Sequence, residues 1–114
     1  MMDIGDIYTV EIPPSDGHEQ AGARPAIIVQ AHQFEDQLPT VLIVPLTSQL
    51  AAQAFPATLL IRPDAENGLA MTSVALVFQL RAIDKRRLGR KIGRLSDSHL
   101  TQVHQFVKSL LRLP

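Results

Sequence analysis

The sequence predicts a mainly β fold, a compact barrel of five or six strands with one helix at its C-terminal end. Val, Ile and Leu are concentrated in short runs separated by turn-forming residues, which is typical of strands. From Ser96 onward, apolar side chains recur at three- and four-residue spacing, which is typical of a helix. The chain has 114 residues, of which 46% are hydrophobic. It is therefore expected to form a single domain over residues 1–114 with a core of its own.

Six apolar runs carry the strand pattern. The expected strands are 6–12, 25–30, 40–46, 57–62, 73–78 and, as a more exposed one, 90–95. Pro25 begins its run, and a proline is tolerated at the first residue of a strand. Pro45 is expected to end regular pairing in its run, because it has no N–H to donate.

The C-terminal segment predicts an amphipathic helix. Ser96 is a suitable N-cap, and Asp97 in the first turn is favourable to the helix dipole. Lys108 and Arg112 lie late in the segment, where positive charge is favourable. The apolar face consists of Leu100, Val103, Phe106, Val107, Leu110 and Leu111.

The net charge of zero hides a strong asymmetry along the chain. Residues 1–80 contain two basic and nine acidic residues, whereas residues 81–114 contain nine basic and two acidic ones. The two parts carry about −7 and +7, and the positive charge is densest between residues 81 and 94. This pattern favours a polyanionic partner, with nucleic acid as the first choice, over a merely solvated surface strip.

Composition also excludes several classes of protein. The chain has no cysteine, so disulfides and thiolate metal sites are excluded, which fits a reducing compartment. The N-terminus lacks the basic flank and apolar run of a signal peptide, and no apolar run is long enough to span a membrane. We therefore expect a cytoplasmic protein that does not enter the membrane.

The first candidate site is the polar loop before the strand at 25–30. Gly17 and Gly22 can adopt positive φ angles, and His18 and Glu19 lie between them. Arg24 follows at the start of the strand, where its planar guanidinium suits a phosphate group. The alternative is that Arg24 pairs with Glu19 and only fastens the loop.

The second candidate site follows the apolar run 40–46. Thr47, Ser48 and Gln49 provide three hydrogen-bonding side chains at the end of a strand, a frequent place for functional residues. The alternative is a local Thr/Ser turn. The other histidines, His32, His99 and His104, do not have metal-ligand spacing, so no metal site is predicted.

These motifs resemble the MazF/PemK/Kid family of toxin endoribonucleases, over nearly the whole chain. The resemblance is carried by "GDIYTVEI", "GHEQAGARPAIIV", "PLTSQ", "QLRAIDKRRL" and "IGRLS". It implies a small SH3-like barrel of the CcdB/MazF type with a C-terminal helix, working as a cytoplasmic homodimer. It further implies cleavage of single-stranded RNA without metal or cofactor, leaving a 2′,3′-cyclic phosphate and a 5′-hydroxyl. A MazE-like antitoxin is the implied inhibitor.

By motif position, Arg24 and Thr47 resemble the family's catalytic pair, supported by His18 and Glu19. Attack of a ribose 2′-hydroxyl on its own phosphate adds negative charge that a fixed cation and a hydroxyl donor can stabilise. Arginine stays protonated and is a poor general base, so His18 or Glu19 is the expected base. The expected RNA-binding residues are Gln20, Ser48, Gln49, Phe78, Arg81, Lys85, Arg86 and Arg87.

Phe78 departs from the family pattern, because many members carry an acidic residue at this position. An acid–base pair from that strand therefore cannot operate in this chain. Phe78 can instead stack on a base, or it can belong to the core. One alternative function follows from Phe78, a catalytically weak or silent RNA-binding member. A second rests on the related fold of CcdB, a toxin that binds gyrase.

Overall fold

The computed structural model describes residues 2–14, 17 and 22–114. His18, Glu19 and Gln20, all expected at the site, lie outside the described residues. The described chain forms seven strands, four short 3₁₀ helices and one α-helix. In order these are β1 (Asp6–Ile12), β2 (Gly22–Ile28), η1 (His32–Phe34), β3 (Thr40–Thr47), η2 (Leu50–Ala54), β4 (Thr58–Ile61), β5 (Ser73–Leu76), η3 (Val77–Gln79), β6 (Arg81–Asp84), η4 (Lys85–Arg87), β7 (Leu88–Arg94) and α1 (Asp97–Leu111).

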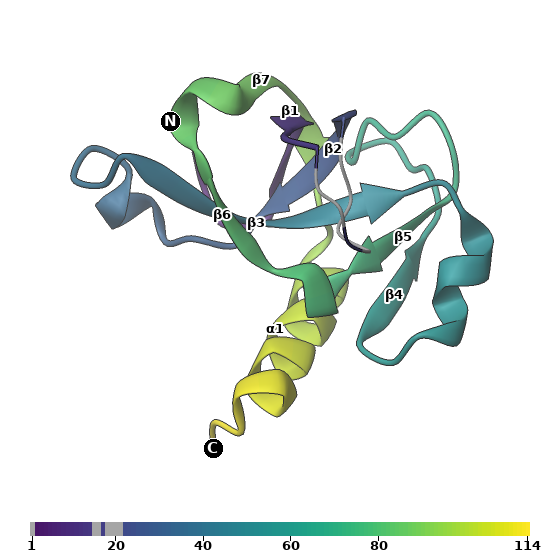
Figure 1. Ribbon diagram of the computed structural model, residues 1–114. Coiled ribbons are helices and arrows are strands. Elements are labelled where there is room, and N and C mark those ends of the chain that lie inside the picture. The colour runs from purple at the N-terminus through teal and green to yellow at the C-terminus, as the bar shows by residue number, and fades with distance from the viewer. Residues whose placement is uncertain (1, 15–16, 18–21) are drawn as a thin grey trace.

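The strands form a curved antiparallel sheet that stays open at its edges (Figure 1). The strand order is β4-β5-β3-β2-β1-β7, and β6 pairs with β3 beside this path. The helix α1 packs against β4 and η3. The expected mainly β architecture with a C-terminal helix is confirmed, although the barrel-like sheet is not closed.

Both faces of the central strands are buried, which explains why their sequences are almost continuously apolar. Neighbouring residues of a strand point to opposite faces. Ile27 of β2 and Val44 of β3 belong to a core that α1 covers, whereas Ile28 and Ile43 belong to a second core on the other face. Ile83 of β6 completes the second core. Together the two cores hold the sheet in its curved shape.

The expectation that Pro45 ends regular pairing is wrong, because β3 continues to Thr47. Pro45 pairs with Ala26 of β2 on one edge of β3. On the other edge, β6 pairs up to Ile43 and β5 begins at Leu46, so the described chain provides no ladder partner there for Pro45. A proline fits this position because its missing N–H is not needed for a ladder.

The sequence missed β6, and several strand ends differ from those expected. Only Ile83 of the four β6 residues is buried, so the segment lacks the apolar pattern of a strand and was assigned to the basic run. The strand expected at 25–30 begins three residues earlier, and the one expected at 73–78 gives way to η3 after Leu76. The strand at 90–95 was expected to be exposed, and β7 is indeed partly to fully exposed along its length.

The helix begins as its sequence predicts. The Ser96 hydroxyl accepts a hydrogen bond of 3.2 Å from the His99 backbone N–H and caps the N-terminus of α1. Leu100 and Val103 are buried against the sheet, and Phe106 packs beside them. The amphipathic pattern therefore places α1 on the first core.

The segment between β4 and β5 is organised around one buried amide, that of Asn67. Its Oδ1 accepts hydrogen bonds from the backbone N–H groups of Asp64 and Leu69, at 3.2 and 3.0 Å. Its Nδ2 donates to the Arg62 carbonyl at 2.9 Å. Gly68 follows with φ +68°, and a Cβ there would lie 1.9 Å from the Ile92 carbonyl oxygen of β7. These contacts fasten the segment against β7.

We expect Asn67→Ala to lower the free energy of unfolding by about 2–3 kcal/mol, because two backbone N–H groups and a carbonyl lose a buried partner. Urea unfolding followed by circular dichroism measures this change. Gln53→Ala is the control, since the Gln53 side chain is exposed and its loss is expected to change stability by less than about 0.5 kcal/mol. Equal unfolding midpoints for the two variants would contradict the role of Asn67.

Candidate active site

Arg24 and Thr47 are brought together by the register of β2 and β3. The ladder between these strands pairs Ile28 with Ile43 and ends at Ala26 and Pro45. Two residues further along each strand lie Arg24 and Thr47, which therefore point to the same face of the sheet. Both line a cavity of about 310 Å³. The residue patterns marked the two positions separately and the motif resemblance joined them as a pair; in the structure both line one cavity.

Arg24 is held more firmly than the sequence predicts. It is the third residue of β2 rather than the end of a loop, and it pairs with Val10 of β1. Gly22, which begins the strand, has the expected positive φ of 86°. The backbone that carries the guanidinium is thus fixed within the sheet.

Thr47 is 3% exposed and ends β3. Its Oγ1 accepts a 3.1 Å hydrogen bond from the Gln49 backbone N–H, so the local Thr/Ser turn that the sequence offered as the alternative is present. A hydroxyl can donate one hydrogen bond in addition to those it accepts, and Thr47 can therefore still donate to an anion in the cavity. Ser48 is exposed and lines the same cavity, whereas Gln49 is exposed outside it.

The remaining wall of the cavity comes from the segment before β5, which sequence analysis missed. Leu69, Ala70 and Met71 line the cavity together with Ser73. The Ser73 hydroxyl donates a 2.9 Å hydrogen bond to the Met71 carbonyl and so fixes this stretch. The sequence shows a turn at Asp64–Asn67, but it does not show that the residues after this turn lie next to Thr47.

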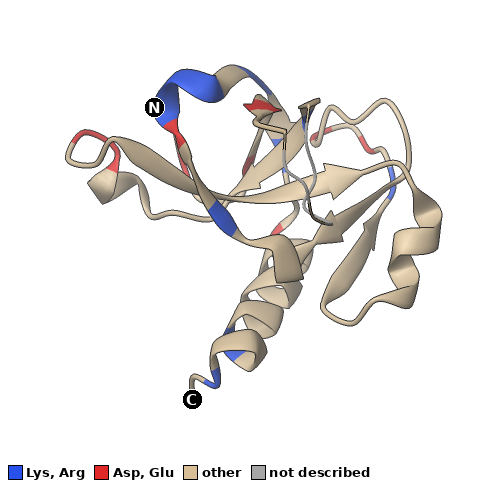
Figure 2. Ribbon diagram, viewed as in Figure 1, with Lys and Arg blue, Asp and Glu red and all other residues tan. Residues whose placement is uncertain are grey.

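A second cleft of about 290 Å³ shares the lining residue Ala23 with the first. Its charged lining residues are Arg86, Arg87 and Glu11. Figure 2 shows the basic residues of η4 gathered at one end of the sheet, above β6. The structure thus brings part of the predicted basic surface next to the Arg24 cavity, although the two are far apart in sequence.

The cations of this surface differ in their partners. The Arg86 guanidinium donates two hydrogen bonds to the Asp84 carboxylate, at 3.1 and 2.9 Å. These bonds, with a third from the Arg86 backbone, lower the pKa of Asp84 to about 2. Lys85 donates to the Glu35 carbonyl. Arg87 is exposed and forms no ion pair with any described residue, although its charge also helps to lower the pKa of Asp84.

Phe78 and Arg81 do not line the cavity. The Phe78 ring is 37% exposed and packs against the Phe55 ring, with centroids 5.4 Å apart. The core interpretation of Phe78 is therefore wrong, because its ring belongs to a surface pair. Arg81 is partly exposed at the start of β6, opposite Ile43 of β3.

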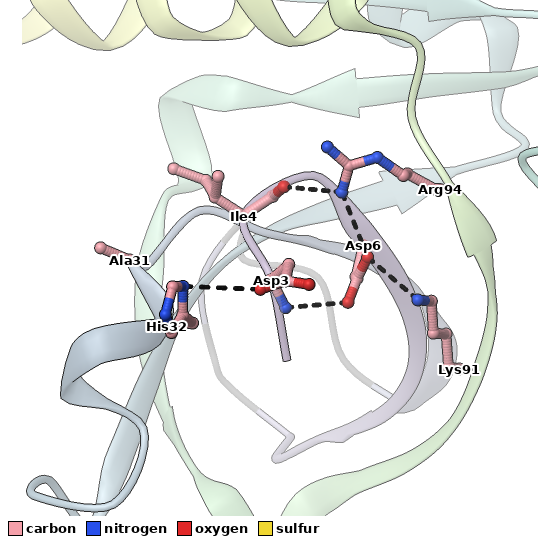
Figure 3. Close-up of a pocket in the computed structure, with 7 residues that line it drawn as sticks. All are labelled: Asp3, Ile4, Asp6, Ala31, His32, Lys91 and Arg94. Atoms are coloured by element: carbon pink, nitrogen blue, oxygen red, sulfur yellow. Dashed lines mark hydrogen bonds and ion pairs between the residues drawn. The ribbon is translucent and has the colours of Figure 1, made fainter. Parts of the chain in front are cut away.

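A further cleft, of about 480 Å³, lies at the opposite end of β2, and several of the residues that line it form ion pairs with one another (Figure 3). The Asp6 carboxylate at its base is buried and accepts ion pairs from Lys91 at 3.3 Å and Arg94 at 3.4 Å. Asp6 also accepts a 2.8 Å bond from the Asp3 backbone N–H. His32, for which the sequence showed no partner, lies 3.5 Å from the Asp3 carboxylate. The charged side chains of this cleft form ion pairs with one another, so the cleft is a weaker candidate for a substrate-binding site than the Arg24 cavity.

In the described part of the chain, no three His, Asp or Glu side chains are grouped as a metal site. None of the helices described has the length and apolar character needed to cross a lipid bilayer.

The comparison with protein families decides the class. The family of the PemK-like, MazF-like toxin of type II toxin–antitoxin systems matches residues 3–111. The chain belongs to this family. Its sequence is also 33% identical, over 113 residues, to the endoribonuclease MazF of Staphylococcus saprophyticus, covering 99% of this chain and 93% of that protein.

Solved structures of family members share the whole fold. MazF from Deinococcus radiodurans superimposes with a TM-score of 0.83 at 26% identity, covering 98% of this chain and 97% of that one. The MazE–MazF complex from the same organism (Form-II) contains a chain with a TM-score of 0.75 at 25% identity, covering 99% and 97%. The toxin MazF-mt6 of Mycobacterium tuberculosis, at 22% identity, shares the fold with a TM-score of 0.77 and coverage of 96% and 98%.

The structural role of the Asp6 cleft leads to a prediction about Arg94. Its guanidinium also donates to the Ile4 carbonyl at 3.2 Å. Arg94→Ala removes both contacts, and because Arg94 is partly solvated we expect a loss of only about 1–2 kcal/mol in the free energy of unfolding. Urea unfolding measures it. Arg90→Ala, at an exposed position of the same strand, is the control. An equal loss of unfolding free energy in both variants would show that the Arg94 contacts in the Asp6 cleft do not stabilise the fold.

Proposed function

We propose that this protein is a toxin endoribonuclease that cleaves single-stranded RNA without a metal ion. The observation that carries the proposal is the presence of Arg24 and Thr47 in one cavity at the ends of two paired strands. The family membership and the name of the Staphylococcus relative support the same activity. The need for a neighbouring 2′-hydroxyl as nucleophile makes RNA, rather than DNA, the substrate.

In the proposed reaction the ribose 2′-oxygen attacks the adjacent phosphorus, and the bond to the 5′-oxygen of the next nucleotide breaks. The 2′-hydroxyl proton goes to a base, and the departing 5′-oxygen takes up a proton from a general acid, a role proposed for Arg24. Arg24 and the Thr47 hydroxyl bind the non-bridging oxygens, whose charge increases in the transition state. Donors fixed in advance cost little reorganisation, and one such donor typically contributes about 3–4 kcal/mol.

The base is proposed to be His18 or Glu19. The described residues that line the cavity include no carboxylate and no imidazole. An arginine guanidinium is a poor base, because it is already a cation with no lone pair to accept the proton. The base must therefore come from elsewhere, and histidine and glutamate are among the residue types that commonly act as general bases.

The RNA backbone is proposed to run from the Arg24 cavity into the adjoining cleft of Arg86 and Arg87. Both clefts share Ala23, so a chain of phosphates can occupy both. The exposed guanidiniums attract the RNA, and ions released from it add to the binding free energy. Because a solved structure of this fold is a MazE–MazF complex from Deinococcus, we propose a MazE-like antitoxin as the inhibitor. We also propose a homodimer as the working form and the cytoplasm as its location, as the sequence analysis predicts.

We expect Thr47→Val to reduce the rate of RNA cleavage about 100- to 1,000-fold, because the variant keeps the side-chain volume but loses the hydroxyl donor. Thr47→Ser keeps the hydroxyl and is the control, with an expected loss of less than about tenfold. The measurement is cleavage of a long mixed-sequence RNA in excess EDTA, with circular dichroism to confirm folding. Arg24→Ala is expected to be at least as damaging as Thr47→Val.

Discrete fragments that end in a cyclic phosphate, formed in EDTA, would support the proposal. Intact RNA after incubation with folded wild-type protein would contradict it. If that protein still bound RNA in a salt-sensitive manner, it would be a catalytically silent member; if it bound gyrase instead, it would be a CcdB-like toxin.

Arg87→Ala is expected to make RNA binding less dependent on salt. Each phosphate contact with single-stranded nucleic acid contributes about 0.7 to the slope of log affinity against log salt concentration, so the slope falls by about that amount. Titration of a 2′-O-methyl RNA, which cannot be cleaved, measures the slope. Lys108→Ala in the last turn of α1 serves as the control, and an identical slope for wild type and Arg87→Ala would remove Arg87 from the RNA path.

A further inference from the structure

The Arg24 cavity has two chemically different sides. Arg24, Thr47 and Ser48 provide charge and hydroxyl groups, which suit a phosphate. The stretch from Leu69 to Met71 provides an apolar wall. A volume of about 310 Å³ exceeds what one phosphate group fills. The cavity can therefore hold part of a nucleotide beyond the phosphate.

The apolar wall is fixed at both ends. On one side, the Asn67 amide binds the Leu69 backbone N–H, and Leu69 is itself only 7% exposed. On the other side, the Ser73 hydroxyl binds the Met71 carbonyl. Gly68 lies so close to β7 that the segment cannot shift toward it. A wall held in this way loses little conformational entropy when a ligand packs on it.

Met71 is the exposed part of this wall. Its side chain is 61% exposed, although it borders a cavity whose other side carries the proposed catalytic groups. A thioether is polarisable, and it packs favourably against flat aromatic surfaces. A nucleobase is the flat surface that single-stranded RNA brings next to each phosphate.

We propose that residues 69–71 form a seat for the nucleobase beside the scissile phosphate, with Met71 packing against the face of the base. This inference rests on the proposed function, because it assumes that RNA occupies the cavity. The buried Leu69 supports the seat from below. Ser48, exposed in the same cavity, can hydrogen-bond the polar edge of the base. The wall therefore contributes to the choice of the cleaved sequence.

The test measures base preference at the cut in Met71→Ala. Cleavage of a randomised RNA, followed by sequencing of the ends, gives kcat/KM for each base on either side of the cut. We expect the preference at one of these two positions to fall about tenfold, the size typical of losing an apolar contact in a specificity pocket. Met71→Leu keeps an apolar wall and is expected to retain most of the preference. Leu111→Ala, with a similar exposure of 57% on α1, is the control.

A second readout does not depend on cleavage. A 2′-O-methyl RNA that carries 2-aminopurine beside the cut position is titrated with each protein, and stacking against the wall is expected to quench its fluorescence. Quenching that is reduced in Met71→Ala but unchanged in Leu111→Ala would support the seat. If wild type cleaves RNA and Met71→Ala changes neither the preference nor the quenching, the seat is wrong while the endoribonuclease stands. If wild type does not cleave, the proposed function fails, and the fluorescence alone decides whether a base occupies the wall.

Discussion

The rest of the structure depends on the pairing of β3 with three other strands. β6 pairs with residues 40–43 of β3, β2 with residues 43–45, and β5 with Leu46 and Thr47. Buried residues lie on both faces of the sheet that these pairings form. The ladder with β2 ends at Pro45, so Thr47 lies beside a cavity rather than inside a ladder with that strand. The strand that joins the parts of the fold therefore also carries one residue of the site.

The strands that carry the site residues explain why the site is fixed before any ligand binds. Arg24 and Thr47 lie on strands whose backbones are paired on at least one side. The third wall is a loop, yet the buried Asn67 amide fastens it through three hydrogen bonds. Electrostatic catalysis requires that donors be held in place in advance, because reorganisation during the reaction costs free energy. The sheet and the Asn67 contacts supply that rigidity.

Much of the fold could be predicted from the sequence, because local patterns determine it. The apolar runs of the central strands and the helix with its Ser96 cap were all predicted close to their observed positions. β6 could not be predicted, because its pairing with β3 depends on a single buried side chain, Ile83. The prediction that pairing ends at Pro45 was wrong, because the sequence does not show where a strand exchanges one neighbouring strand for another.

The site was predicted in part for the same reason. Arg24, Thr47 and Ser48 occupy strand ends that the sequence marks, and motif resemblance assigns them roles. The wall from Leu69 to Met71 has no motif, and only the long-range return of the loop to β3 brings it to the cavity. For Phe78 the sequence pattern gave a wrong prediction. Its position in an apolar run favoured the core, but the strand ends at Leu76 and the Phe78 ring packs against Phe55 at the surface.

Different positive charges serve to attract the RNA and to stabilise the reacting phosphate. Arg86 and Arg87 of η4 are exposed, and at physiological salt their field is screened within about 8 Å. They can therefore raise the encounter rate and bind nearby phosphates, but they act weakly on a reaction in the neighbouring cavity. Arg24 is partly buried and stands on a paired strand, so its charge acts at short range in a less polar setting. Among the described residues that line the cavity it is the one cation, and stabilisation of the reacting phosphate falls mainly to it.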